Sequence, residues 1–235
     1  MHFKAKRCDQ CLIPPAYCVC KVAEPESVAT RVTVVIHFSD VIRATNTGKF
    51  VPLVLANSEV LLRGVKGDPL DMSRAILPDH HNLLLYPSAE SVPLTPAYVA
   101  AIGQPINVIV PDGNWNQAGK MVRREQLVHE VPHVYLNVDK PSRYRLRTAA
   151  HENWISTFEA VARALGIIEN PDLQQRLEYF FDVAVERILF LKGQLPREKV
   201  TGGITSAMIR QYHTDNEDQV FLAAHDKRTG ENQAK

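Results

Sequence analysis

The chain has 235 residues, 45% hydrophobic and 23% charged, which is enough to bury a core and suits one medium domain with appendages. Twenty-seven basic residues nearly balance twenty-six acidic ones, for a formal net charge of +1. This balance excludes a molecule whose overall field attracts nucleic acid, so a polyanion would have to bind a local patch. No apolar run approaches the ~20 residues of a membrane span, and the first residues lack the apolar stretch of a signal peptide. We therefore expect a cytoplasmic protein.

All four cysteines are clustered near the N-terminus, as a CxxC pair followed by a CxC pair. They are Cys8, Cys11, Cys18 and Cys20. Four thiolates at this spacing are typical of a closed, tetrahedral zinc site with Zn–S distances of about 2.3 Å. An iron–sulfur cluster and four unrelated thiols are the alternatives. The pattern predicts a zinc-binding segment over residues 1–24.

Short apolar runs rich in β-branched residues recur along the chain. They span residues 31–38, 53–64, 83–87, 106–111 and 133–138. Their continuous apolarity predicts strands buried on both faces, as in a mostly parallel sheet. Apolar residues at helical spacing over 152–166, and again from Leu173 to Leu189, predict two helices that cover the sheet. The fold class is therefore α/β, with a C-terminal extension over 196–235 whose last residues are polar enough to fray.

The stretch Asp112-Gly113-Asn114-Trp115 directly follows the apolar run 106–111. Ligands of an open α/β sheet bind beyond the carboxyl ends of its strands. Asp112 is a candidate general base or ligand-binding carboxylate, and an Asp-Gly turn is the alternative. Trp115 is a candidate for stacking on adenine or on a flipped base, or else a core residue.

The stretch from Thr45 to Gly48 reads TNTG, a loop whose backbone amides could face a ligand; a solvated turn is the alternative. In SRYRLRT, residues 142–148, arginines alternate at period two, which places three guanidinium groups on one face of an extended chain. Such groups could neutralise RNA phosphates, unless they are ordinary solvated arginines. The candidate RNA-binding residues are Arg43, Lys49, Lys120, Arg123, Arg124, Arg143, Arg145 and Arg147.

The ordered set of these motifs resembles the DTW-domain family of tRNA-uridine aminocarboxypropyltransferases, over nearly the whole chain to about residue 195. The set comprises the cysteine cluster, TNTG, LLYPS, DGNW, SRYRLR and STFEAVARAL. The resemblance implies a SPOUT-related catalytic domain over 25–195, with a C-terminal trefoil knot. It also implies transfer of the 3-amino-3-carboxypropyl group of S-adenosylmethionine to N3 of a tRNA uridine, releasing methylthioadenosine. Bacterial members of this size are similar to the enzyme that modifies uridine 47, in the variable loop; no membrane or protein partner is implied.

The same resemblance assigns site residues. Asp112 and Trp115 would be catalytic. The donor would be held by Thr47, Leu85, Pro87, Ser88, Asp112, Gly113, Trp115, Leu136, Tyr144, Ser156 and Thr157. Asp112 would act as the base or would hold the donor's amino group. The family has Thr or Ser where this chain has Asn114, which we interpret as a tolerated variant. Two alternative functions are a SPOUT-type RNA methyltransferase and a non-catalytic, zinc-containing RNA-binding protein.

Overall fold

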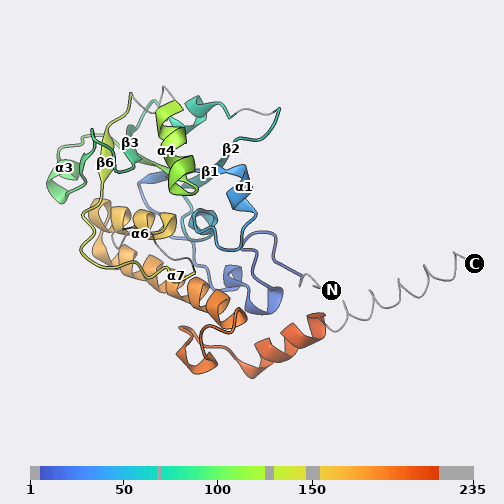
Figure 1. Cartoon of the computed structure of the whole chain (residues 1–235). Helices are drawn as coiled ribbons and strands as arrows, with labels where there is room; N and C mark the ends of the chain where they lie inside the picture. Colours follow the sequence, from blue (N-terminus) through green and yellow to red (C-terminus); the bar gives the residue numbers. More distant parts are fainter. Residues whose placement is uncertain (1–5, 68–69, 125–129, 147–153, 217–235) are drawn as a thin grey trace, which may run out of the picture.

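A six-stranded, wholly parallel sheet forms the centre of the computed structural model (Figure 1). The structure describes residues 6–67, 70–124, 130–146 and 154–216, without the side chain of Trp115. The strand order is β2-β1-β5-β3-β6-β4. The strands are β1 (Arg31–His37), β2 (Ser58–Arg63), β3 (His81–Leu85), β4 (Val92–Pro93), β5 (Ile106–Asp112) and β6 (His133–Tyr135).

Helices cover both faces of this sheet. The helices in the described part of the chain are α1 (Phe38–Val41), α2 (Val51–Val54), α3 (Pro96–Ala100), α4 (Trp115–Arg124), α6 (Thr157–Ile168), α7 (Pro171–Leu191) and a further helix over 206–216. Successive strand side chains point to opposite faces. Val34 accordingly belongs to the larger core, with α6 and α7, whereas Val35 belongs to a smaller core with Met121 of α4. The result is a three-layer α/β arrangement.

The N-terminal segment is part of the larger core. Cys11, Ile13 and Tyr17 are buried there together with residues of α7. The Tyr17 ring lies 5.7 Å from that of Phe190 and 5.2 Å from that of Tyr212, between centroids. The cysteine segment therefore braces α7 and the helix over 206–216. The domain boundaries after residues 24 and 195 stay predictions.

The predicted α/β class and mostly parallel sheet are confirmed. The apolar run 53–64 divides, however: its first residues complete α2, where Pro52 suits the first turn of a helix, and β2 starts at Ser58. The predicted helix over 152–166 begins later, at Thr157. No helix in the described part of the chain is long and apolar enough to cross a membrane. The trefoil knot stays a prediction.

Candidate active site

A cavity of about 1020 Å³ opens at the carboxyl ends of the strands, where ligands of parallel sheets bind. Nine of the predicted donor-binding residues line it: Thr47, Leu85, Pro87, Asp112, Gly113, Leu136, Tyr144, Ser156 and Thr157. Ser88 is not among the described lining residues, and its Oγ lies 3.0 Å from His133 Nδ1. The Trp115 side chain lies outside the described part. The roles of all these residues stay predictions.

Asp112 ends β5 and is 5% exposed. Its Oδ2 accepts a hydrogen bond from Asn46 Nδ2 at 2.6 Å, and its Oδ1 accepts one from Thr157 Oγ1 at 2.6 Å. Burial raises the pKa of this carboxyl above its usual value, while the bonds from Thr157 and Asn46 oppose the rise. The site thus holds a fixed carboxylate that accepts a proton more readily than an exposed one.

Gly48 permits this arrangement. A Cβ atom at this position would lie 2.3 Å from Asp112 Oδ2, closer than real Cβ contacts come. Hydrogen bonds fix the loop around Gly48. Asn46 Oδ1 accepts one from the Lys49 amide at 3.1 Å, and Thr47 Oγ1 accepts one from the Phe158 amide at 3.3 Å. The first three residues of TNTG line the cavity, and Asn46, Thr47 and Gly48 are buried, so this stretch is not a solvated turn.

Asn114 begins α4. Its Oδ1 accepts a hydrogen bond from the Gln117 amide at 3.0 Å, and Gln117 Oε1 accepts one from the Asn114 amide at 2.7 Å. This reciprocal pair is a capping box. Because Asn, Ser and Thr are all favourable N-cap residues, capping explains how Asn114 replaces the hydroxyl residue of the family motif.

Glu159 fixes the segment that closes one side of the cavity. It forms a capping box with Ser156 at the start of α6. Its carboxylate also accepts hydrogen bonds from Ser142 Oγ at 2.7 Å and from the Arg143 amide at 2.6 Å. The Tyr144 hydroxyl donates to the Thr45 carbonyl at 2.6 Å. Glu159 is therefore structural and attaches residues 142 and 143 to α6, while Tyr144 attaches the same segment to the loop after β1.

Sequence reasoning missed several lining residues. Asp40, in α1, is 2% exposed and lines the cavity together with Asp112 and the exposed Asp139. Trp154, which the sequence places in a helical core stripe, lies before α6 and also lines the cavity. Among the described lining residues there are three carboxylates and no Lys, Arg or His. Such a cavity favours a cationic ligand.

The candidate RNA-binding residues have different environments. Lys120, Arg123 and Arg124 are exposed on α4. Arg143 Nη1 lies 2.8 Å from Asp182, and Arg145 Nη2 lies 2.6 Å from Glu186, so these two arginines pair with carboxylates of α7.

The other candidates are close to the loop after β1 or beyond the described residues. Arg43 pairs with Asp40 at 3.2 Å. Lys49 is 6% exposed and donates to the Arg43 carbonyl, so its ammonium faces the interior. Arg147 lies outside the described residues. The RNA-binding set stays a prediction, and the exposed basic residues of α4 are its best-placed members.

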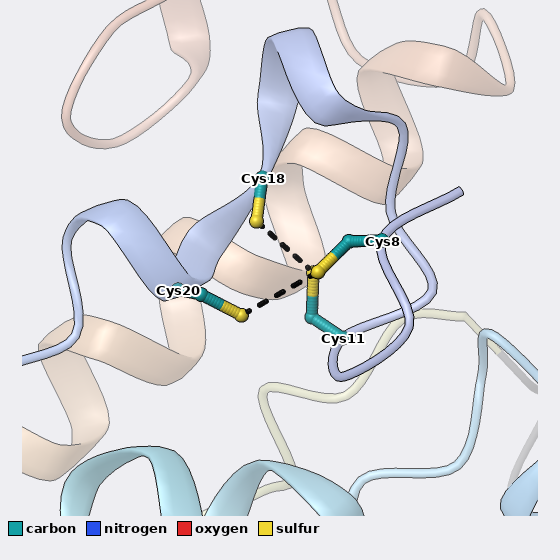
Figure 2. Close-up of side chains that lie close together, drawn as sticks. All are labelled: Cys8, Cys11, Cys18 and Cys20. Carbon is teal, nitrogen blue, oxygen red and sulfur yellow. Dashed lines mark hydrogen bonds between the residues drawn. The ribbon is translucent and has the colours of Figure 1, made fainter. Parts of the chain in front are cut away.

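The four cysteines converge on one point (Figure 2). All four Sγ atoms lie within 4.8 Å of one another, with Cys8 to Cys20 at 3.8 Å and Cys11 to Cys18 at 3.6 Å. Four sulfurs placed tetrahedrally about 2.3 Å from zinc would be about 3.8 Å apart. Leu12, at a φ of 60°, reverses the chain behind the CxxC pair. The geometry and the sulfur ligands therefore fit a closed, structural zinc site.

Comparison with known proteins gives a consistent set of relatives. The profile described as the DTW domain matches residues 5–189. The chain is 29% identical to tRNA-uridine aminocarboxypropyltransferase 2 of Drosophila melanogaster over 74% of this chain and 71% of that protein. It is 27% identical to the Mus musculus protein of the same name, over 72% of this chain and 59% of that protein.

A plant relative covers more of the chain: tRNA-uridine aminocarboxypropyltransferase A of Arabidopsis thaliana is 26% identical over 85% of this chain and 87% of that protein. These animal and plant relatives do not bear out the bacterial likeness stated above. Among solved structures, the SAM-dependent rRNA:acp-transferase Tsr3 from Vulcanisaeta distributa has a TM-score of 0.42 at 16% identity. That match covers 80% of this chain and 98% of Tsr3.

Proposed function

The chain belongs to the DTW-domain family, and on this premise we propose that it transfers the 3-amino-3-carboxypropyl group of S-adenosylmethionine to N3 of a tRNA uridine. Its relatives from fly, mouse and Arabidopsis are named tRNA-uridine aminocarboxypropyltransferases. The observation that carries the proposal is the buried Asp112 carboxylate in an acidic cavity. The donor is a cation with a sulfonium and an ammonium group, so the negative lining suits it.

The cavity also has the size and lining that this reaction needs. Its volume, about 1020 Å³, is at the upper end of the range for small-molecule sites, which leaves room for both a nucleoside-sized donor and an extruded base. Leu85, Pro87 and Leu136 supply apolar surface for adenine. Uridine N3 is on the Watson–Crick edge, so the base must be unpaired or flipped out to enter.

Asp112 serves as the general base in this proposal. Its carboxylate takes the N3 proton while the bond from N3 to the γ-carbon of the aminocarboxypropyl group forms. The bond from that carbon to sulfur breaks, and methylthioadenosine leaves with the electron pair. Asn46 and Thr157 hold the carboxylate by one hydrogen bond to each oxygen, which positions it for this proton transfer. The raised pKa of Asp112 brings it closer to the working pH of a base.

The remaining assignments complete the proposal. The partner is tRNA, and uridine 47 of the variable loop is the proposed position in a cytoplasmic enzyme. Phosphates would contact the exposed basic residues of α4, Lys120, Arg123 and Arg124. A structural zinc ion held by the four cysteines would stabilise the N-terminal segment against α7.

Product analysis tests the proposal. Incubation of the protein with S-adenosylmethionine and tRNA should release methylthioadenosine and add the aminocarboxypropyl mass to one uridine. Asp112→Asn should reduce the rate by at least about 100-fold while donor binding persists. The rival SPOUT-type methyltransferase would release S-adenosylhomocysteine instead, and a non-catalytic RNA-binding protein would release neither product.

A further inference from the structure

Asp40 has an unsatisfied oxygen next to the candidate active site. It is 2% exposed and lines the cavity. Its Oδ1 is 3.2 Å from Arg43 Nε, whereas its buried Oδ2 has no hydrogen-bond partner among the described residues. A buried polar atom without a partner is costly and rare in folded proteins. Because Asp40 lines the ligand cavity, this oxygen is a candidate acceptor for a hydrogen-bond donor of the ligand.

Strand register puts Asp40 beside Asp112. In the parallel pairing of β1 with β5, Ile36 is opposite Asp112. Asp40 follows four residues later, in α1, and its charge contributes to the electrostatic environment of Asp112. Both residues line the cavity, Asp112 at the end of β5 and Asp40 in the helix that follows the neighbouring strand β1.

On the basis of the proposed function, we infer that Asp40 recognises the α-ammonium group of the donor's aminocarboxypropyl chain. The donor has two positive centres, but the sulfonium has no hydrogen to donate, whereas the ammonium has three N–H groups. Of the two positive centres, only the ammonium can donate a hydrogen bond to Asp40 Oδ2. An ammonium group bound at Asp40 would also place the aminocarboxypropyl chain, and not the methyl group, next to Asp112. Asp40 thereby favours aminocarboxypropyl transfer over methyl transfer.

Three ligands separate the possible roles of Asp40 without any turnover. S-adenosylhomocysteine keeps the ammonium but has no sulfonium charge, and methylthioadenosine has neither. Calorimetric titration of native protein and Asp40→Asn with both ligands, and with S-adenosylmethionine, gives the affinities. We expect Asp40→Asn to lower the affinity for S-adenosylhomocysteine and for S-adenosylmethionine by about tenfold or more. The affinity for methylthioadenosine should fall less than twofold.

Arg43→Gln is the matched control, because it removes the ion-pair partner of Asp40 and leaves the carboxylate. It should keep the native ratio of affinities for S-adenosylhomocysteine and methylthioadenosine. Thermal unfolding of ligand-free Asp40→Asn supplies a second readout. Its Tm should equal or exceed that of the native protein, because the substitution removes a buried carboxylate that has only one of its two oxygens paired.

Several outcomes would overturn the inference. If Asp40→Asn lowered the affinities for S-adenosylhomocysteine and methylthioadenosine equally, and also lowered the Tm, Asp40 would be a structural residue. A loss of affinity for S-adenosylmethionine alone would show that the Asp40 carboxylate interacts with the sulfonium. Unchanged affinity for all three ligands would also defeat the ammonium assignment, yet leave the proposed function standing. Failure of the native protein to bind any of them would defeat both.

Discussion

Thr157 Oγ1 donates a 2.6 Å hydrogen bond to Asp112 Oδ1, and this bond opposes the effect of burial on the carboxylate. Burial raises the pKa of Asp112, because the charged form loses its hydration, whereas the hydroxyl of Thr157 stabilises that charged form. The balance between these two effects sets the pH at which Asp112 can accept a proton. Thr157 therefore tunes the proposed base through this hydrogen bond.

Thr157→Val should move the pH dependence of transfer to higher pH. Without the hydroxyl, the pKa of Asp112 rises further, so a higher pH is needed before the carboxylate loses its proton and can act as a base. Single-turnover rates at saturating donor, measured across pH, test this shift. Thr157→Ser keeps the hydroxyl and should keep the native profile. A uniform drop in rate with no shift would mean that ionisation of Asp112 does not control the reaction.

Gly48→Ala should abolish transfer, because the added Cβ would lie 2.3 Å from Asp112 Oδ2 and displace the carboxylate from Asn46. We expect a loss of stability of about 1 to 3 kcal/mol, as for other overpacked sites. The measurements are chemical denaturation and the transfer rate. Gly103→Ala is the control, because a Cβ at Gly103 meets no atom within 4 Å. Native activity in Gly48→Ala would contradict the described approach of the loop to β5.

Loss of the metal site should destabilise the larger core as a whole. Cys11 and Cys18 are buried in that core beside α7, and a structural zinc site contributes directly to folding free energy. The Cys8→Ser, Cys11→Ser double variant should lose bound zinc and show a lower Tm in a single cooperative transition. Metal analysis and calorimetry measure the two effects. Retention of one zinc per chain in this variant would refute the four-cysteine site.

Lys120→Gln combined with Arg124→Gln should weaken tRNA binding and reduce its salt dependence. Both residues are exposed on α4, and removal of one cation that neutralises a phosphate lowers the salt slope by about 1. Filter binding over a range of salt concentrations measures both quantities. Arg145→Gln is the comparison, because Arg145 already pairs with Glu186 at 2.6 Å and should contribute less. A slope unchanged in the α4 variant would exclude this helix from the RNA interface.

The sequence is most informative where one strand alone determines a residue's place. Apolarity over 106–111 predicts the buried β5, so the position of Asp112 at its carboxyl end follows from the properties of parallel sheets. The CxxC and CxC spacing likewise predicts a cluster that the local turns can form without help from the sheet.

Residues whose role depends on packing between segments are harder to predict. Asp40 and Asn46 approach Asp112 because β1 pairs with β5 in one particular register, and no local pattern reveals that register. The sequence predicts an RNA contact for Lys49, but the loop folds its ammonium back onto the Arg43 carbonyl. Ser88 follows β3 as predicted, yet its hydroxyl lies beside His133 instead of lining the cavity. Each of these depends on tertiary contacts.

The hydrogen bonds that hold Asp112 join segments far apart in the chain. Asn46 is 66 residues from Asp112, and Thr157 is 45 residues away. Contacts of such separation form slowly, because closing long loops is entropically unfavourable. During refolding, binding of S-adenosylhomocysteine should therefore appear after secondary structure has formed. The time at which binding appears would then report when the sheet is complete.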